Sequence, residues 1–401
     1  MDSSEKMEKI VSLAKRRGFV YPGSEIYGGL AGIWDYGPLG SDMLYNIKDL
    51  WWKKFVKGRD EIYGIASSVM MPQQVWSASG HLENFTDPLE GGKFNTMFKT
   101  KVGALKGETD DVYLRPELAQ GMFVNFKNII DSFHPKLPFG IAQIGRCFRN
   151  EISPRDFLFR VREFDLMEFE YFVRENDWEK YFEFWRKEMW GWIDEVGISK
   201  ENVHELEVPK EDLAHYSKRT IDFEYDFPFG RKELYGLAYR TDHDLKNHKL
   251  DYHDEESKET FIPHVIEPTF GAGRTVLAIL CDAYQEDEMG GEKRVFLKFK
   301  PQVAPVKAAV FPLLKNKLEL VKKAREVYEM IRKQIQPVMF DDNGNIGKRY
   351  RRQDEIGTPF CVTIDFDTLE KDSVTIRDRD TGKQERVDTK DILVYIQERL
   401  R

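Results

Sequence analysis

Apolar and polar residues follow one another along the N-terminal part of the chain in patterns that predict its first elements. Residues 5–17 carry Met7, Ile10, Val11 and Ala14 at a helical spacing and predict a helix. The next stretch, 19–40, is rich in glycine and aromatic residues and predicts turns and short strands. Residues 41–58 predict a helix with a Ser/Asp cap, and 66–72 predict a strand that stops at a proline.

The middle of the chain predicts several strands in succession. Residues 114–130 indicate a turn into a helix, with Pro116 suited to the first turn. Two extended segments, 140–151 and 162–173, are joined by a loop at 152–160. Residues 177–197 predict a helix, and 264–284 predict a strand, a glycine-bearing turn and a helix. Because strands do not alternate one for one with helices, we expect an antiparallel α+β sheet rather than a doubly wound parallel one.

A boundary is predicted near residues 301–305, which divides the chain into domains 1–304 and 305–401. Beyond it, a strand at 308–313 and an amphipathic helix at 318–335 begin a β-α-β order. A basic turn at 348–357, two further strands and a last helix from Thr389 complete a compact α/β module of a usual domain size.

Composition limits the classes of protein that are possible. Hydrophobic residues make up 41% and aromatic residues 13%, which is enough for a sizeable core. The net charge of −8 means that any nucleic-acid binding must be local. Residues 306–401 have a net charge of +3 and are the basic part of the chain. Three widely spaced cysteines indicate a reduced, cytoplasmic protein, and no apolar run is long enough to span a membrane.

The segment CFRNEISPRDFLFRVREF, 147–164, carries the strongest chemical signal. In a strand, Arg149 and Glu151 share a face, as do Phe164 and Glu168 on the returning strand. Arginine suits phosphate and an aromatic ring suits a base, so the segment indicates a nucleotide site, with Arg160 in its loop. A salt-bridged surface hairpin is the alternative.

Two more stretches add to this signal. IEPTFGAGR places Glu267 on a strand and Arg274 near a helix start, where an anion is favoured. YLRPELAQG places Glu117 at another turn.

Together with FVYPGSEIYGGLAGIWDYGPLG, LPFGIAQIGRCFRNEISPR, ELYGLAYRTDHDL and GKRYRRQDEIGTPFCVTIDFD, these blocks resemble the glycyl-tRNA synthetase family of class II aminoacyl-tRNA synthetases. The resemblance covers nearly the whole chain. It implies an antiparallel catalytic domain flanked by helices, with motif 1 at about 44–72, motif 2 at about 143–173 and motif 3 at about 264–284. It also implies a C-terminal α/β anticodon-binding domain.

The resemblance implies that glycine is activated by ATP with Mg²⁺, releases pyrophosphate and is then passed to the 3′-terminal ribose of tRNA(Gly). Arg149, Glu151 and Arg274 are the implied catalytic residues. The implied ATP-binding residues are Arg149, Asn150, Glu151, Arg160, Val161, Phe164, Glu233, Leu234 and Arg274, with Glu233 a possible Mg²⁺ ligand. The implied glycine-binding residues are Glu117, Glu168, Glu267, Pro268 and Thr269. Thr269 stands where the family typically has serine, and Leu118 departs from the more usual RPET, so both put details of the pocket in question.

Partners and metal content follow from the same resemblance. Motif 1 implies a homodimer. The predicted anticodon contacts are Arg349, Arg351, Arg352, Gln353, Arg377 and Arg379. No zinc is expected, because the region 83–95 has a short LEGG turn where many relatives carry a cysteine-bearing insertion. The alternatives are another class II synthetase, against which the three glutamates argue, and an inactive accessory protein that only binds nucleic acid.

Overall fold

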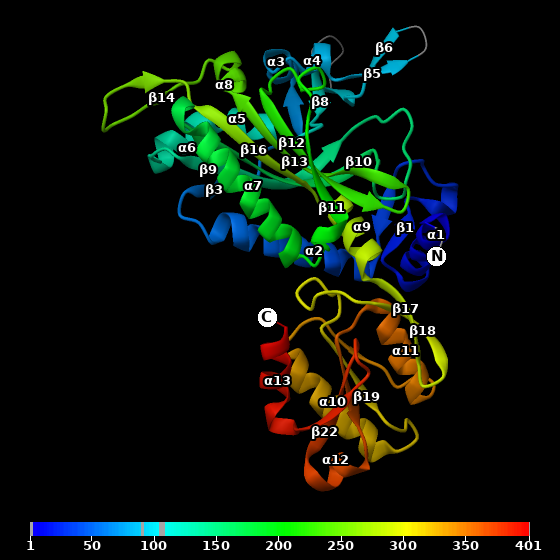
Figure 1. Ribbon diagram of the computed structural model, residues 1–401. Helices are drawn as coiled ribbons and strands as arrows, with labels where there is room; N and C mark the ends of the chain where they lie inside the picture. Colours follow the sequence, from blue (N-terminus) through cyan, green and yellow to red (C-terminus); the bar gives the residue numbers. More distant parts are fainter. Residues whose placement is uncertain (1–2, 90–91, 104–108, 401) are drawn as a thin grey trace.

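A seven-stranded sheet forms the centre of the larger part of the chain (Figure 1), whose computed structural model describes residues 3–89, 92–103 and 109–400. The strand order is β11-β12-β13-β16-β10-β9-β3, and only β3 and β9 run parallel. The bounds are β3 Ile62–Gly64, β9 Phe139–Phe148, β10 Glu163–Val173, β11 Val203–Glu207, β12 Arg219–Phe227, β13 Gly230–Thr241 and β16 His264–Gly271. The antiparallel α+β class predicted from the sequence is confirmed.

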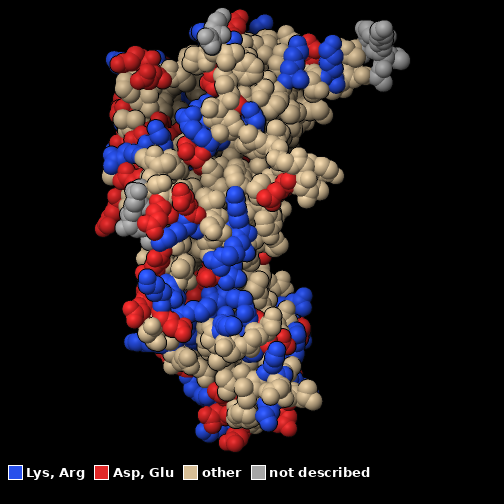
Figure 2. Space-filling view, turned by 90° about the vertical axis from the view of Figure 1, so that its right-hand side faces the viewer, with Lys and Arg blue, Asp and Glu red and all other residues tan. Residues whose placement is uncertain are grey.

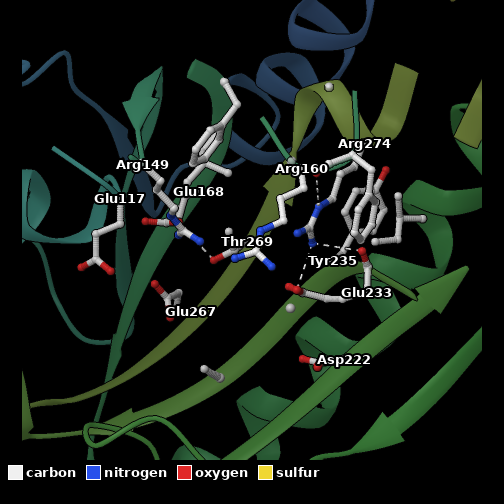
Figure 3. A pocket seen from close by; sticks show the side chains of 18 of the residues that line it. Glu117, Arg149, Arg160, Glu168, Asp222, Glu233, Tyr235, Glu267, Thr269 and Arg274 are labelled. Carbon is white, nitrogen blue, oxygen red and sulfur yellow. Dashed lines mark hydrogen bonds and ion pairs between the residues drawn. The ribbon is translucent and has the colours of Figure 1, made fainter. Parts of the chain in front are cut away.

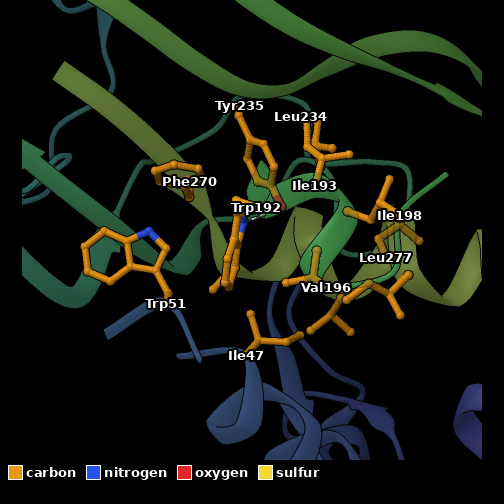
Figure 4. Close-up of a cluster of buried hydrophobic side chains, with 14 of the residues drawn as sticks. Ile47, Trp51, Trp192, Ile193, Val196, Ile198, Leu234, Tyr235, Phe270 and Leu277 are labelled. Atoms are coloured by element: carbon orange, nitrogen blue, oxygen red, sulfur yellow. Dashed lines mark hydrogen bonds between the residues drawn. The ribbon is translucent and has the colours of Figure 1, made fainter. Parts of the chain in front are cut away.

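One face of this sheet packs on the main hydrophobic core. The helices on this side are α2 Pro38–Trp52, which a π-helical turn continues to Lys57, α7 Trp178–Glu195 and α9 Ala272–Ala283, with α1 Ser3–Arg17 beside them. Trp51 of α2 and Trp192 of α7 both meet Phe270 of β16, at ring-centroid distances of 6.0 and 6.2 Å (Figure 4). Buried aromatic rings contribute large apolar areas, so this contact fixes the sheet on its helices.

The other face of the sheet is only partly covered. Short helices α5 Ala119–Phe123, α6 Phe126–Phe133 and α8 His243–Asn247 lie on it with a second core cluster. Beside them are a three-stranded sheet, β4 Met70–Pro72, β8 Asp110–Leu114 and β7 Lys99–Val102, and a hairpin, β5 Thr86–Leu89 and β6 Gly92–Asn95. Helices α3 Gln73–Ala78 and α4 His81–Asn84 lead into the hairpin. The rest of this sheet face borders a cavity.

The C-terminal part has its own sheet and core. The strand order is β20-β19-β21-β22-β23, with bounds Val338–Phe340, Ala308–Pro312, Phe360–Ile364, Ser373–Asp378 and Gln384–Asp388. Its helices are α10 Leu318–Arg332, α11 Ile346–Ile356, α12 Phe366–Lys371 and α13 Ile392–Arg399. β19 runs parallel to β20 and β21, as the predicted β-α-β order requires. The domain limits at 304 and 305 stay a prediction.

Short hairpins complete the described strands. They are β1 Val20–Pro22 with β2 Trp34–Tyr36, β14 Tyr252–His253 with β15 Thr260–Phe261, and β17 Tyr284–Met289 with β18 Glu292–Leu297. In Figure 1 the last of these, β17–β18, lies between the two parts of the chain, beside α11. None of the described helices has the length and apolar character that a membrane crossing needs.

Three predicted boundaries near the N-terminal half are wrong. Helix α2 begins at Pro38 with Gly37 before it, so the predicted Ser41 and Asp42 cap lies inside the helix. Proline has its φ already fixed for a first helical turn, which explains the earlier start. Only Met70–Pro72 of the predicted strand is extended, and α5 starts at Ala119, after Pro116.

The predicted basic turn at 348–357 is also wrong, because this segment forms helix α11. The side chain of Asn345 accepts a hydrogen bond from the backbone of Lys348 at 2.9 Å and caps the helix start. Gly357 ends the helix with φ +77°, a left-handed conformation that glycine adopts without strain. Between these two caps lies a run of arginines. Its polarity is typical of a loop, but its backbone is helical.

Candidate active site

A cavity of about 340 Å³ lies over the sheet, bordered by β10, β13, β16 and the loop after β9 (Figure 3). Of the residues predicted for glycine and ATP, the structure places all but Asn150 and Pro268 in its lining. Pro268 is buried and, by strand alternation, points away from the side of the sheet that Glu267 and Thr269 face. The backbone N–H of Asn150 donates to the Thr96 carbonyl at 2.7 Å.

The predicted strand geometry of the arginine segment needs one correction. Strand β9 ends at Phe148, so Arg149 and Glu151 lie beyond the strand and strand alternation does not align them. The backbone N–H of Arg149 still bonds to the Arg162 carbonyl at 2.9 Å, which holds the start of the loop beside β10. Both side chains reach the cavity because the loop turns back over it.

Carboxylates gather at one end of the cavity. Glu117, Glu168 and Glu267 arrive from the turn before α5, from β10 and from β16, and all three are buried. A fully buried arginine, Arg240 of β13, donates to Glu267 at 2.9 and 3.1 Å. It also forms a two-bond pair with Asp244, at 2.8 and 3.0 Å. One guanidinium is thus shared between two carboxylates.

The carboxyl groups at this end differ in their pKa values. Burial raises the pKa of Glu267 to about 7, although Arg240 works against it. Burial also raises the pKa of Glu168 well above its usual range, with the nearby charges of Glu267 and Glu117 adding to the effect. Burial acts the same way on Glu117, but His81 and Arg240 outweigh it and hold its pKa well below the usual range. The cavity therefore holds an ionised carboxylate, Glu117, beside two carboxyls whose pKa values are raised, with that of Glu267 at about 7.

Arg160 and Arg274 lie at the opposite end of the cavity, whereas Arg149 lies closer to the glutamates (Figure 3), with its Nε donating to the Pro116 carbonyl at 3.2 Å. Arg274 pairs with Glu233 at 2.9 Å and lies over the ring of Phe159, 4.5 Å from its centroid. The charge of Arg274 is the main cause that lowers the pKa of Glu233, and the hydrogen bond from Arg274 adds to it. Burial of Glu233 acts in the opposite direction. Arg149 lies between the rings of Phe164 and Phe85, at 5.3 and 5.2 Å. Such stacked guanidinium groups keep N–H donors free for phosphate oxygens.

A segment after α3 contacts residues that line the cavity, and the sequence did not predict these contacts. His81 meets Glu117 at 3.0 Å, and its other ring nitrogen lies 2.8 Å from the Ser79 hydroxyl. Asp87 of the β5–β6 hairpin pairs with Arg160 at 3.1 Å, and Arg160 also bonds to Glu151 at 2.5 Å. The hairpin joins Leu89 to Gly92, and Glu90 and Gly91 of the predicted LEGG turn lie outside the described residues.

Sequence reasoning missed several residues of the site. Arg240, His81, Phe159 and Asp222 carry no assigned role in the motifs, yet each lines the cavity or bonds to a residue that does, and Asp244 bonds to Arg240 behind it. Arg240 and Asp244 stand four apart in the block ELYGLAYRTDHDL, and this spacing, together with that block, was the available signal. Burial raises the pKa of Asp222 to about 7, with Glu233 adding to the effect.

The predicted anticodon contacts are mostly buried, which contradicts a solvent-facing patch of all six residues. Arg349, Gln353, Arg377 and Arg379 are each less than 5% exposed. Arg349 donates to the carbonyls of Pro312, Asp342 and Gly344, and Arg377 pairs with Asp354. Only Arg351 and Arg352 keep partial exposure. Lysines and arginines do gather at mid-height on the face shown in Figure 2, where the two parts of the chain meet.

Comparisons with known proteins agree over both parts of the chain. Residues 98–283 match the family described as the tRNA synthetase class II core domain (G, H, P, S and T), and 307–399 match the anticodon binding domain. The glycine–tRNA ligase of Clostridium acetobutylicum is 45% identical over 100% of both chains. That of Caldanaerobacter subterraneus subsp. tengcongensis is 45% identical over 98% of each, and that of Thermobifida fusca is 46% identical over 99% of this chain and 98% of its own.

Proposed function

The chain belongs to the glycine–tRNA ligase family, and we propose that the cavity over its central sheet is where ATP activates glycine and tRNA receives it. The chain is an ATP-dependent ligase with a class II core and an anticodon-binding domain. The observation that carries the proposal is one cavity with carboxylates at one end and arginines at the other. Glycine has an ammonium and a carboxylate, and ATP has three phosphates. A cavity with carboxylates at one end and arginines at the other therefore suits both substrates.

We propose that the ammonium of glycine binds among Glu117, Glu168 and Glu267, while its carboxylate points to Arg149. Glycine has no side chain, so selectivity comes from a wall that excludes a Cβ atom. Thr269 supplies part of that wall, and its hydroxyl donates to Glu168 at 3.1 Å. Pro268 acts through the backbone of β16, because its side chain faces away from the cavity.

ATP binds at the arginine end in this proposal. Arg149 holds the α-phosphate and Arg160 the γ-phosphate, and Glu151 contacts the adenine amino group. The base stacks near Arg274 and Phe164, with Phe159 as a further ring, and Asn150, Val161 and Leu234 supply backbone contacts. Mg²⁺ enters with the phosphates, with Glu233 as its candidate carboxylate. Because Arg160 is paired with Glu151 and Asp87, the phosphates must replace those carboxylates when they bind.

The reaction follows from this placement. A carboxylate oxygen of glycine attacks the α-phosphorus, the bond to the bridging oxygen breaks, and pyrophosphate leaves. The 3′-hydroxyl oxygen of tRNA(Gly) then attacks the glycyl carbonyl, and AMP leaves. The arginines offset the repulsion between the two anions and hold the in-line geometry, which is most of what this chemistry requires. We assign no side chain as the base for the second step.

We propose that the protein acts as a cytoplasmic homodimer without zinc. Large apolar side chains are exposed in the region that leads into motif 1 and on α2: Ile26 and Tyr27 are 88% and 87% exposed, and Tyr45 is 69% exposed. Exposed apolar groups of this size suit an interface between subunits. Light scattering after gel filtration should give twice the chain mass, and Tyr45→Lys should shift it toward one chain mass. A wild-type protein of one chain mass contradicts the dimer.

Amino-acid-dependent ATP–pyrophosphate exchange tests the function directly. Glycine, alanine, serine and proline are compared, with Arg149→Ala as the control variant. We expect exchange with glycine alone and its loss in the control. A folded protein with no exchange for any amino acid contradicts catalysis and favours the nucleic-acid-binding accessory protein instead.

A further inference from the structure

A fourth glutamate lies beneath the carboxylate end of the cavity. Glu170 of β10 is 0% exposed and does not line the cavity, whereas Glu168, two residues earlier on the same sheet face, does. Neither carboxyl oxygen of Glu170 has a hydrogen-bond partner among the described residues, and Oε1 of Glu168 has none either. Buried carboxyl oxygens almost always have partners, so three unpaired ones side by side call for a physical cause.

The charges around Glu170 come from four elements. Glu168 lies on β10, Glu267 on β16, Arg240 on β13 and Asp244 on α8. One oxygen each from Glu168, Glu170 and Glu267 lie within 4.8 Å of one another. Arg240 faces this group, but its N–H groups already bond to Glu267 and Asp244. The buried Arg115 also acts on Glu168, but it donates to the backbone carbonyls of Arg146 and Ser67 and to the Ser67 hydroxyl. Among the described residues, neither Glu168 nor Glu170 forms an ion pair with a cation.

Two buried carboxylates without a cation cannot both stay ionised, because removal from water and mutual repulsion disfavour the charged form. Glu168 reaches the cavity, where the glycine ammonium can neutralise it. Glu170 does not reach the cavity, so a ligand there cannot pair with it. The proton is therefore best held by Glu170, and burial, followed by the charge of Glu267, raises its pKa well above the usual range.

We propose that Glu170 is a neutral carboxylic acid that donates a hydrogen bond toward the free oxygen of Glu168. It is then a positioning residue, which holds that carboxylate toward the glycine ammonium without touching glycine itself. This inference rests on the proposed glycine site. The floor of the cavity then carries a hydrogen-bond donor at Glu170, although an ionised glutamate would be only an acceptor.

Infrared difference spectroscopy tests the protonation without any need for activity. The spectrum of the wild-type protein minus that of Glu170→Gln, at pH 7, should contain the carbonyl stretch of a protonated carboxyl group, shifted in D₂O. The matched control is Glu255→Gln, since Glu255 lies at the surface beside Lys258 and its difference spectrum should show only an ionised carboxylate. A carboxylate band alone for Glu170, or a band that appears only after a chelator removes a bound cation, overturns the proposal.

Kinetics of glycine-dependent exchange test the positioning role. Glu170→Gln keeps a donor of the same shape, so its KM for glycine should stay within about threefold of the wild type. Glu170→Leu removes the donor and should raise the KM for glycine about tenfold, because the buried Oε1 of Glu168 then lacks a partner. The KM for ATP and the kcat at saturating glycine should change little in both variants. Equal losses in both variants, or none in Glu170→Leu, overturn the positioning role.

The failure of this inference differs from the failure of the proposed function. A wild-type protein that shows no glycine-dependent exchange contradicts the function, but the infrared band still reports the state of Glu170. A normal exchange activity with an ionised Glu170 contradicts the inference alone. Circular dichroism of both variants, compared with the wild type, separates loss of fold from loss of positioning.

Discussion

Two buried networks of arginine and carboxylate lie in this chain, one under the cavity and one where the C-terminal part meets the β17–β18 hairpin. At the junction, Arg377 pairs with Asp354 at 2.8 and 3.0 Å, and Arg379 donates to the carbonyls of Gly357 and Phe299. Arg294 joins Asp287 and the Arg379 carbonyl there. None of these side-chain atoms is among the described buried atoms without a partner. Under the cavity, oxygens of Glu168 and Glu170 have none.

The difference teaches how to separate a binding site from a structural network of the same composition. A complete network of buried charges holds its partners and has no free group for a ligand. An incomplete one leaves buried polar atoms whose cost must be offset by a ligand, a proton or a function. The junction is complete and the cavity floor is not, so mutations in the first should act on stability and in the second on substrate binding.

The largest expected effect is on catalysis, at the arginine end of the cavity. Arg274→Ala removes a guanidinium that faces the proposed nucleotide, and we expect glycine-dependent exchange to fall roughly a hundredfold or more. The free energy of unfolding should change by less than about 1 kcal/mol, because the Arg274–Glu233 pair is partly exposed. Exchange rates and chemical denaturation measure the two effects. If Arg274→Ala is clearly less stable but keeps its exchange rate, the assignment of cavity residues to catalysis and junction residues to stability is wrong.

The next largest effect is on stability, at the junction. Arg377→Ala leaves Asp354 buried with fewer partners, and we expect the free energy of unfolding to fall by about 3–5 kcal/mol. The kcat/KM for glycine exchange, per folded molecule, should stay within about twofold. Denaturant titration and exchange at low temperature check both numbers. The matched variant Arg352→Ala, whose pair with Asp341 is partly exposed, should cost less than about 1 kcal/mol.

A third prediction concerns pH and the cavity floor. Burial raises the pKa of Glu267 to about 7, so a fraction of this group is protonated below neutrality and cannot attract the glycine ammonium. We therefore expect the kcat/KM for glycine to rise with pH up to about 7, and to fall about tenfold for each pH unit below it. The KM for ATP should not follow this profile.

The control for this profile is Asp222→Asn. Asp222 has a pKa of about 7 at the arginine side of the cavity, so it is the other group that could produce the same midpoint. If the glycine profile persists in Asp222→Asn, Glu267 accounts for it. If the profile disappears, the assignment of the titration to the cavity floor is wrong.

The same comparison shows what the sequence could predict. The sheet class, the glutamates 117, 168 and 267, and the cavity arginines were all predicted, because each lies in a motif with a local pattern. Arg240 and His81 were not, since the carboxylates that they meet, Glu267 and Glu117, lie far away in the sequence, and Asp244 holds Arg240 from four residues on. The pairing of β13 with β16, in which Ala238 lies opposite Glu267, is what brings Arg240 to that carboxylate.

The junction arginines show the opposite error. Arg349, Arg377 and Arg379 were predicted to contact the anticodon from the family resemblance and from their basic charge. Helix α11 instead buries Arg349, Gln353 and Asp354, and β22 presents Arg377 to them. Burial of a polar helix face depends on which segment packs on it, and hydrophobic patterning does not report that. Arg351 and Arg352 remain the predicted contacts that solvent reaches.

The smallest expected effect lies at the hydrogen bond from Thr269 to Glu168 at the cavity floor. The Thr269 hydroxyl donates to Glu168, so Thr269→Ser keeps the bond and removes only a methyl group. We expect the KM for glycine to stay within about twofold, and exchange with alanine to rise about fourfold, as one lost methyl group allows. Thr269→Val is the matched variant. It keeps the shape but removes the donor to Oε2 of Glu168, so its KM for glycine should rise more than that of Thr269→Ser. Equal glycine KM values in the two variants would mean that glycine binding does not depend on the hydrogen bond from Thr269 to Glu168. The unpaired oxygens of Glu168 and Glu170 would then overstate how many hydrogen-bond partners the cavity floor lacks.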